Sequence, residues 1–209
     1  FLYSRSFELM VQLESMPVMR VLSNATRVIA EGEVLQLTKV RDASTTEDIY
    51  MEVIRAKTAM LFEASTQCAA LLVNASAEQT EALRQDGDKL GIAFQLMDDL
   101  LDYQGDAETL GKNVGDDLAE GKPALPLIVA MRQGTPEHAQ LVRTAIQKGG
   151  LEDLAAIGEA VRDSGALAYT SDKARDYAEQ AIACLDVLPN SVYKNAMADL
   201  ARFAVERSL

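Results

Sequence analysis

The spacing of the apolar residues constrains the fold of this chain more than any other feature of its sequence. Apolar residues recur every three or four positions: Val18, Val21, Leu22, Ala25, Val28 and Ile29 in one stretch, and Ile49, Val53, Ala56, Met60 and Leu61 in another. This spacing places them on one face of an α-helix, whereas a β-strand needs an alternation with a period of two, which the sequence does not sustain. The sequence therefore predicts an all-α fold.

The prolines indicate where the helices are separated. All five lie between helical stretches or at the starts of them: Pro17, Pro123, Pro126, Pro136 and Pro189. Proline is tolerated there because the first helical turn leaves its N–H groups without an intrahelical acceptor. We expect helices at about residues 2–15, 17–40, 46–74, 77–104, 124–133, 136–148, 151–163, 166–187 and 190–206. The longest of these predict a bundle of long, mostly antiparallel helices around a deep central cavity.

Three helix starts also carry capping patterns. The pairs are Ser44 with Glu47, Ser76 with Gln79, and Thr135 with Pro136. The first two pairs have the spacing of a capping box, in which each side chain accepts a hydrogen bond from the backbone N–H of the other residue. In the third pair, a threonine precedes a proline at the first helical position. These patterns support the predicted starts near residues 46, 77 and 136.

The length and composition of the chain limit the classes of protein to which it can belong. A chain of 209 residues can bury one substantial core, so we treat residues 1–209 as a single domain. Cys68 and Cys184 lack the spacing of a disulfide framework or a zinc site, and we expect two small buried residues in a reducing cytoplasm. The formal net charge of −12 argues against a nucleic-acid partner, because phosphate backbones are bound by basic surfaces. No apolar run approaches the roughly 18–20 residues of a transmembrane helix, which favours a cytoplasmic protein.

The stretch FQLMDDLLDY, residues 94–103, places an acidic face on an otherwise apolar helix. Four polar side chains fall within an arc of about 100° on such a helix: Gln95, Asp98, Asp99 and Asp102. Like charges at positions i and i+4 destabilise a helix, and no basic residue between Gly91 and Gln104 offsets them. Mg²⁺ is the counter-charge that oxygen-only ligands favour. The residues alone leave a solvated outer face open as the alternative.

Two common ion and phosphate motifs are excluded. An EF-hand loop starting at Asp102 would have Ala107 in place of the turn glycine and Asn113 in place of the bidentate glutamate. A Walker phosphate loop needs Ser or Thr directly after its lysine, whereas Asn113 follows Lys112 and proline follows Lys122. Neither motif accounts for this acidic and glycine-rich region.

Residues 110–126, LGKNVGDDLAEGKPALP, form a second candidate ligand-binding segment. Its glycines let the backbone approach a ligand closely, and Lys112 and Lys122 carry charges suited to phosphate oxygens. Lys57 and Thr58 lie mid-helix among apolar residues. The plain alternatives are a surface loop, a lysine that extends to solvent and a threonine bonded to its own helix. Taken together with the acidic face, these residues predict a magnesium diphosphate pocket that opens into an apolar cavity.

The residues described so far resemble those of the trans-type polyprenyl diphosphate synthases. The second aspartate-rich motif of that family, FQxxDDxxD, is matched by residues 94–102. The resemblance covers nearly the whole chain, through FLYSRSFELM, AEGEVLQL, KTAMLFEA, LGKNVGDDLAEGKPALPL and RTAI. It is greatest to the bacterial octaprenyl branch of the family.

The resemblance implies an isoprenoid synthase fold, usually homodimeric, in which two aspartate motifs hold Mg²⁺ across a pocket. It implies metal binding by Asp98 directly, and by Asp99 and Asp102 directly or through water. It assigns catalysis and binding of the allylic diphosphate to five residues: Lys57, Thr58, Gln95, Lys112 and Lys122. The first aspartate motif and the residues for isopentenyl diphosphate should precede Phe1, so we expect the N-terminal third of a usual subunit to be missing from this sequence.

The implied activity is that of a prenyltransferase. In this Mg²⁺-dependent head-to-tail condensation, isopentenyl diphosphate is joined to an allylic diphosphate such as farnesyl diphosphate. The closest resemblance implies an all-trans product of forty carbons for quinone side chains. Candidates for lining a product tunnel are Phe7, Met10, Val34 and Leu37, which we interpret as ordinary core residues. The alternatives are a non-catalytic helical subunit of a heteromeric prenyl synthase, a shorter-chain synthase and a related terpene-processing enzyme.

Overall fold

The all-α prediction is confirmed. The structure is a computed structural model that describes residues 1–104, 115–149 and 152–206. Within these ranges the regular elements are α-helices, one π-helical segment and one short 3-10 segment, and none is a β-strand. No helix in the described part of the chain is long and apolar enough to cross a membrane.

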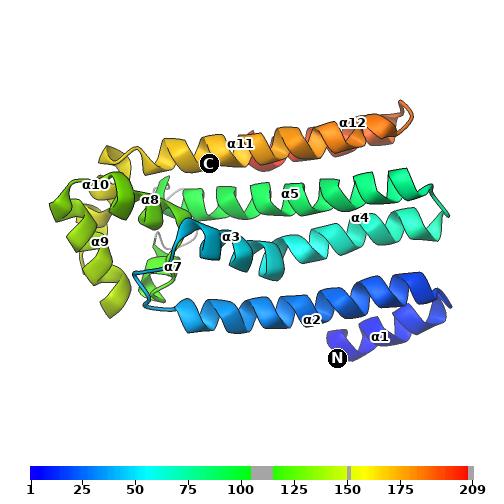
Figure 1. Cartoon of the computed structure of the whole chain (residues 1–209), viewed down its shortest axis with the longest axis horizontal. Helices are drawn as coiled ribbons and strands as arrows, with labels where there is room; N and C mark the ends of the chain where they lie inside the picture. The colour runs from blue at the N-terminus through cyan, green and yellow to red at the C-terminus, as the bar shows by residue number, and fades with distance from the viewer. Residues whose placement is uncertain (105–114, 150–151, 207–209) are drawn as a thin grey trace.

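The long helices run side by side along the length of the molecule (Figure 1). They are α1 (Leu2–Gln12), α2 (Met16–Lys39), α4 (Met60–Leu72), α5 (Ala77–Gln104), α11 (Ala166–Cys184) and α12 (Val192–Glu206). Helix α3 (Glu47–Ile54) and the π-helical segment η1 (Arg55–Ala59) lead directly into α4. The helices between α5 and α11 lie across one end of the bundle: α7 (Asp116–Ala119), α8 (Leu125–Gln133), α9 (Pro136–Lys148) and α10 (Leu154–Asp163). The 3-10 segment η2 (Leu185–Val187) follows α11.

Helix α5 lies in the centre of the bundle, between α4 and α11 (Figure 1). Its approach to the preceding helix is very close. A Cβ atom added at Gly91 would lie 2.5 Å from the Cα of Ala59. Because such a contact is sterically impossible, glycine at this position lets the two helix backbones meet. The close packing fixes α5 against the segment that carries Lys57 and Thr58.

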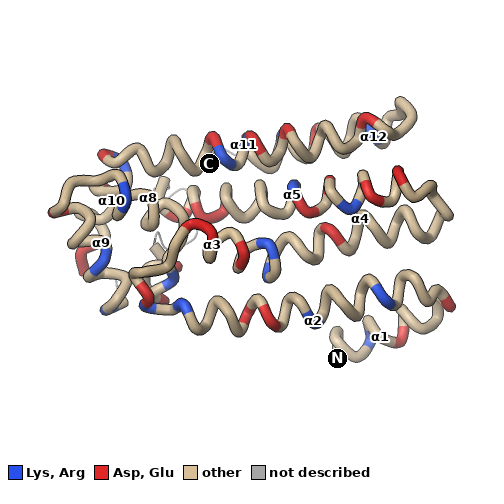
Figure 2. Tube along the Cα trace, viewed as in Figure 1, with Lys and Arg blue, Asp and Glu red and all other residues tan. Residues whose placement is uncertain are grey.

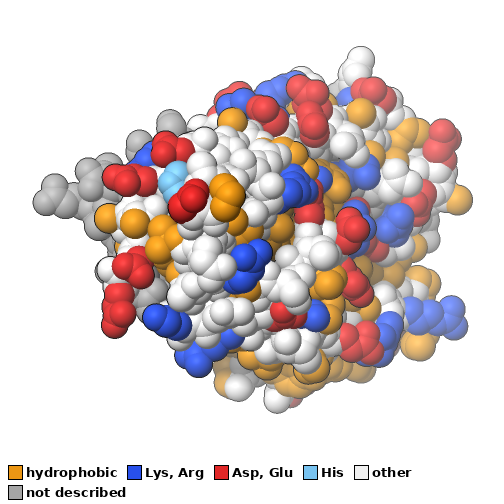
Figure 3. All heavy atoms as spheres, turned by 60° about the vertical axis from the view of Figure 1, so that its left-hand side comes forward, with side chains coloured by type: hydrophobic (Ala, Val, Ile, Leu, Met, Phe, Trp, Pro, Cys, Tyr) orange, Lys and Arg blue, Asp and Glu red, His pale blue; other side chains and the backbone are white. Residues whose placement is uncertain are grey.

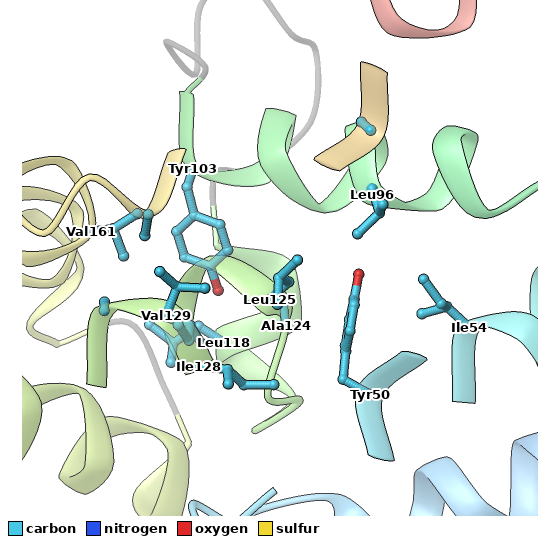
Figure 4. Close-up of a cluster of buried hydrophobic side chains, with 14 of the residues drawn as sticks. Tyr50, Ile54, Leu96, Tyr103, Leu118, Ala124, Leu125, Ile128, Val129 and Val161 are labelled. Atoms are coloured by element: carbon cyan, nitrogen blue, oxygen red, sulfur yellow. The ribbon is translucent and has the colours of Figure 1, made fainter. Parts of the chain in front are cut away.

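A cluster of buried apolar side chains fills the end of the bundle near α8 (Figure 4). Leu125 and Val129 from α8, Leu96 and Tyr103 from α5, and Tyr50 from α3 are all nearly inaccessible to solvent. The Tyr50 hydroxyl is turned toward α5 in Figure 4. This cluster therefore joins α3, α5 and α8 just beneath the charged residues singled out in the sequence.

Two of the three predicted capping patterns are confirmed. The Ser76 and Gln79 side chains accept hydrogen bonds from each other's backbone N–H groups at 3.1 and 3.2 Å. The Thr135 hydroxyl accepts a bond from the N–H of His138. The third prediction was wrong, because Thr46 rather than Ser44 caps α3 by accepting from the N–H of Ile49 at 3.3 Å. The hydroxyl of Ser44 instead donates to Asp42.

The predicted helix boundaries need three corrections. The helix expected over residues 46–74 is interrupted by η1, whose five-residue hydrogen-bond spacing no apolar pattern indicated. The helix expected over residues 166–187 ends in the 3-10 segment η2. Helix α7, only four residues long, was not predicted. Short and distorted turns carry too few residues for a periodic pattern to form.

The interpretation of Phe7, Met10, Val34 and Leu37 as core residues was wrong, because none of the four is fully buried. Val34 and Leu37 are 61% and 63% exposed on α2, while Phe7 and Met10 are partly buried on α1. Exposed apolar residues lie on both of the first two helices, because Leu9 and Val11 of α1 are also exposed, at 49% and 63%.

The cysteine expectation is met in part. Cys68 and Cys184 are both free, which agrees with the absence of a disulfide pattern. Cys68 is buried, but Cys184 is only partly so.

Candidate functional site

A cavity of about 200 Å³ opens at the end of the bundle where α2, η1 and α5 meet the segment around α7. Its wall contains Lys57, Thr58, Gln95, Asp98 and Asp99. Other residues of the wall come from α2, from the α7 region and from the apolar side of α3, and they include Gln36, Lys39, Asp117, Lys122, Val53 and Ile54. Figure 2 shows the acidic end of α5 opposite basic residues near the ends of α2 and α7. Most of the residues predicted to bind a diphosphate therefore share one pocket.

Lys57 and Thr58 lie within the π-helical segment η1. Such segments widen the helical turn, and they occur frequently at functional sites. The Lys57 ammonium contacts Glu33 Oε2 at 2.8 Å and donates a hydrogen bond to Gln36 Oε1. The Thr58 hydroxyl donates to Gln95 Oε1 at 2.8 Å. The plain alternatives for this pair, a solvent-directed lysine and a threonine bonded to its own helix, do not describe these contacts.

Asp99 is the most deeply buried acid of the pocket, at 4% exposure. Its two oxygens accept hydrogen bonds from Gln95 Nε2 at 2.7 Å and from the Tyr50 hydroxyl at 2.6 Å. Burial raises the pKa of Asp99 to about 7, and the charge of Asp117 adds to this rise. The two hydrogen bonds oppose the rise because they stabilise the ionised carboxylate. Thr58, Gln95, Asp99 and Tyr50 thus form one connected set of hydrogen bonds.

The predicted acidic face divides into two parts. Asp98 and Asp99 line the pocket, and Asp98 is partly buried. Asp102 is not part of the pocket wall. Its carboxylate accepts hydrogen bonds from the backbone N–H groups of Gly115 and Asp117 at 3.2 and 3.4 Å. Asp102 therefore holds the start of α7 against the end of α5, a contact that helical geometry alone could not predict.

Asp117 brings a further carboxylate to the pocket from α7. Burial raises the pKa of Asp117, while the neighbouring Lys122 ammonium opposes the rise. Lys122 lies 3.5 Å from Asp117 and 2.6 Å from Glu120. The lysine is thus in the pocket, as predicted. Lys112, the other lysine predicted in this segment, lies outside the described residues.

The donor atoms of the pocket suit a hard divalent cation, but they do not form a complete coordination site. Burial and like charge raise the pKa values of Asp99 and Asp117, and a bound cation would relieve that repulsion. No group of three or more His, Cys, Asp or Glu side chains within the described ranges could hold a metal ion together. Asp98 and Asp99 therefore fit Mg²⁺ if phosphate oxygens and water complete its coordination, which is the usual arrangement for this ion.

Acidic and basic side chains are mixed on the face of the molecule shown in Figure 3. The visible described residues do not form a continuous basic surface there. This face lacks the concentration of positive charge expected of a site for a nucleic-acid backbone.

The fold and the pocket define a class of all-α bundles with a carboxylate- and lysine-lined cavity at one end. The family model for polyprenyl synthetase matches residues 1–163, and the chain belongs to this family. It is 51% identical over 208 residues to octaprenyl diphosphate synthase of Escherichia coli K12. That alignment covers 99% of this chain and 64% of the relative, so the chain spans slightly less than two thirds of the relative's length.

Solved structures of related proteins have the same fold. The polyprenyl synthase of Caulobacter crescentus CB15, complexed with calcium and isoprenyl diphosphate, superposes with a TM-score of 0.93 at 45% identity. The match covers 99% of this chain and 63% of that one. A decaprenyl diphosphate synthase from Rhodobacter capsulatus superposes with a TM-score of 0.91 at 42% identity, covering 98% and 64% of the two chains. These comparisons agree with the family resemblance of the sequence.

Five polar residues of the pocket were not predicted: Gln36, Lys39, Thr45, Tyr50 and Asp117. Tyr50 precedes Lys57 by seven residues, a spacing that places two residues on the same face of a helix. That spacing was the available signal for Tyr50. No comparable signal exists for Asp117, because its position depends on how the end of α5 binds the start of α7.

Proposed function

We propose that the protein is a prenyltransferase that joins isopentenyl diphosphate to an allylic diphosphate in a Mg²⁺-dependent, head-to-tail condensation. Membership of the polyprenyl synthetase family supports this proposal. The observation that carries it is the convergence of Lys57, Lys122, Asp98 and Asp99 on one cavity. Carboxylates and lysines together suit a metal-bound diphosphate. Lysines alone would repel the metal ion, and carboxylates alone would leave the charge of the diphosphate unbalanced.

Each residue has a distinct role in this proposal. Lys57 and Lys122 bind oxygens of the allylic diphosphate and balance its charge as it leaves. Thr58 and Gln95 orient Asp99 through their hydrogen bonds. Asp98, which lines the same cavity, binds the metal directly in this proposal. Mg²⁺, when bound, supplies positive charge to the departing diphosphate. We extend the proposal to Lys112 as a diphosphate ligand and to Asp102 as a metal ligand through water, as the family resemblance implies.

The substrate and product are proposed from the relatives. The similarity to octaprenyl diphosphate synthase favours farnesyl diphosphate or a similar allylic substrate and an all-trans product of forty carbons. The decaprenyl diphosphate synthase with the same fold shows why product length needs its own measurement. The apolar side of the pocket, formed by Val53 and Ile54, suits the hydrocarbon part of such a substrate.

We also propose that the chain is part of a single domain that acts as a homodimer in the cytoplasm. Exposed apolar residues on α1 and α2, including Leu9, Val34 and Leu37, support the dimer because such surfaces are usually covered. Two free cysteines support a reducing compartment.

The test is an assay of the full-length protein with farnesyl diphosphate, isopentenyl diphosphate and Mg²⁺, followed by sizing of the lipid products. We expect one dominant all-trans product near forty carbons. Asp98→Asn should lower kcat by about 100-fold or more, because it removes a charged ligand of the metal. The matched control Asp172→Asn, at a 74% exposed side chain, should leave kcat unchanged. Full turnover by the Asp98 variant would contradict the proposal.

A further inference from the structure

The ammonium group of Lys57 is held by two residues of a neighbouring helix. Both residues are on α2: Gln36 Oε1 accepts a hydrogen bond from Lys57 Nζ at 2.5 Å, and the Glu33 carboxylate forms an ion pair with the same ammonium at 2.8 Å. The two acceptors are three residues apart and therefore lie on the same side of their helix. An ammonium carries three N–H donors and makes two contacts with α2, so at least one donor is left for the pocket that Lys57 and Gln36 both line.

The backbone of α2 lies directly against the π-helical segment that carries Lys57. A Cβ atom added at Gly32 would lie 2.8 Å from Ala56 Cβ and 2.9 Å from the backbone nitrogen of Lys57. Atoms of the backbone cannot move aside as the end of a flexible side chain can, so an alanine here must push α2 and η1 apart. Gly32 therefore permits the approach that brings Gln36 within reach of Lys57.

The contact between these residues contributes little to folding. The side chains of Lys57 and Glu33 are 34% and 46% exposed, and ion pairs with such exposure are weak stabilisers. The ordering of Lys57 matters more for binding. A free lysine loses much rotamer freedom when it closes on an anion, whereas a lysine already held in place loses less.

From these contacts we infer that Gly32 and Gln36 are positioning residues for Lys57. Gly32 lets α2 pack against the π-helical segment, and Gln36, with Glu33 as a second acceptor, fixes the ammonium so that its remaining donor points to the ligand. The inference rests on the proposed function, because the ligand of Lys57 is taken to be a diphosphate. It assigns a role to Gly32 and Gln36 of the AEGEVLQL segment, to which the sequence analysis gave none.

The test is titration calorimetry of the full-length protein with inorganic diphosphate and Mg²⁺. Gln36→Met keeps the length of the side chain, removes the acceptor and leaves the charge unchanged. It should weaken binding by about three- to tenfold, which corresponds to the cost of ordering one long side chain. Gly32→Ala should weaken binding by a similar factor. Circular dichroism identifies variants that fail to fold, and Gln36→Met carries the test if Gly32→Ala is one of them.

One control variant matches Gly32→Ala, and a second changes another residue of α2. Gly158→Ala adds the same methyl group to another helical glycine, where it meets only the flexible Arg162 side chain at 3.3 Å. Glu31→Gln changes a 62% exposed residue of α2 that pairs with Arg27. Both controls should bind inorganic diphosphate as the unmodified protein does. A loss of binding in the controls as large as in the test variants would overturn the inference.

A double-mutant cycle separates this inference from the proposed function. Lys57→Met should weaken binding on its own, and Gln36→Met should then add nothing, because the two residues act as one unit. If Lys57→Met leaves binding intact, the proposed function of the pocket is wrong. If Lys57→Met weakens binding but Gln36→Met and Gly32→Ala do not, the function stands and the positioning role is wrong. A loss from Gln36→Met that persists without Lys57 would show direct contact with the ligand, which also overturns the positioning role.

Discussion

Replacement of Asp86 by asparagine should flatten the dependence of stability on pH. Asp86 lies on α5, is 1% exposed, and its Oδ2 has no hydrogen-bond partner within the described part of the chain. Burial without compensation raises the pKa of Asp86 from 3.8 to about 7. The residue therefore keeps its proton in the folded protein at pH values where it has lost it in the unfolded chain.

The sign and size of the effect follow from that difference. Between about pH 4 and pH 7 the folded state binds more protons at Asp86 than the unfolded state does, so the free energy of unfolding falls as the pH rises. Each unit of difference between the folded and unfolded pKa values corresponds to about 1.4 kcal/mol. The full cost of ionising the buried carboxyl is therefore about 4 kcal/mol. About 2 kcal/mol of this cost falls between pH 5 and pH 7. The asparagine side chain does not ionise, so this contribution should be absent from the variant.

The assay is urea unfolding at pH 5, 6, 7 and 8 of the unmodified protein, Asp86→Asn and the exposed control Asp172→Asn. Between pH 5 and pH 7, the free energy of unfolding of the unmodified protein and of Asp172→Asn should fall by about 2 kcal/mol more than that of Asp86→Asn. Buried acids of the pocket titrate in all three proteins and cancel in this comparison. Parallel curves for Asp86→Asn and the unmodified protein would refute the reasoning.

Three other substitutions have expected outcomes. Glu47→Gln should lower the free energy of unfolding by about 2–3 kcal/mol in urea titrations, because it weakens the bonds of a mostly buried carboxylate to Arg132 and to helix α11. A change below about 0.5 kcal/mol would show that Glu47 contributes no more than an ordinary surface residue. Tyr50→Phe should lower the free energy of unfolding by about 1.5–3 kcal/mol at pH 8, because one oxygen of Asp99 loses its hydrogen-bond donor, and by less at pH 5, where that carboxyl is protonated. An equal loss at both pH values would argue against a hydrogen bond to an ionised carboxylate. Lys122→Met should weaken binding of inorganic diphosphate with Mg²⁺ by about tenfold in calorimetry, as expected for the loss of one charged hydrogen bond, and unchanged affinity would remove Lys122 from the site.

The sequence predicted the fold because long helices repeat one signal many times. Residues 77–104 carry a complete helical pattern with a capping box at its start, and the structure has a helix over the same range. The same regularity put Gln95, Asp98 and Asp99 on one face. Local geometry and composition were therefore sufficient for the long helices and for the residues of α5 in the candidate site.

The rest of the site depends on contacts between segments that are distant in the sequence. Asp102 shares the predicted helical face, but its carboxylate accepts hydrogen bonds from the N–H groups of Gly115 and Asp117, and Asp102 is not among the described residues that line the pocket. Ser44 and Glu47 have the spacing of a capping box, but the carboxylate of Glu47 binds groups from α8 and α11 instead. A pattern along one helix predicts which residues share a face, and only the packing of other helices decides what that face binds.

Titration calorimetry of inorganic diphosphate, with Mg²⁺ and with EDTA, tests the metal-bridged pocket most directly. We expect the full-length protein to bind diphosphate with Mg²⁺ and to show no measurable binding in EDTA, because Asp98 and Asp99 face the same cavity as the anion. The variant Asp98→Asn should lose most of the binding that Mg²⁺ supports. Equal affinity for diphosphate with Mg²⁺ and with EDTA would contradict the account.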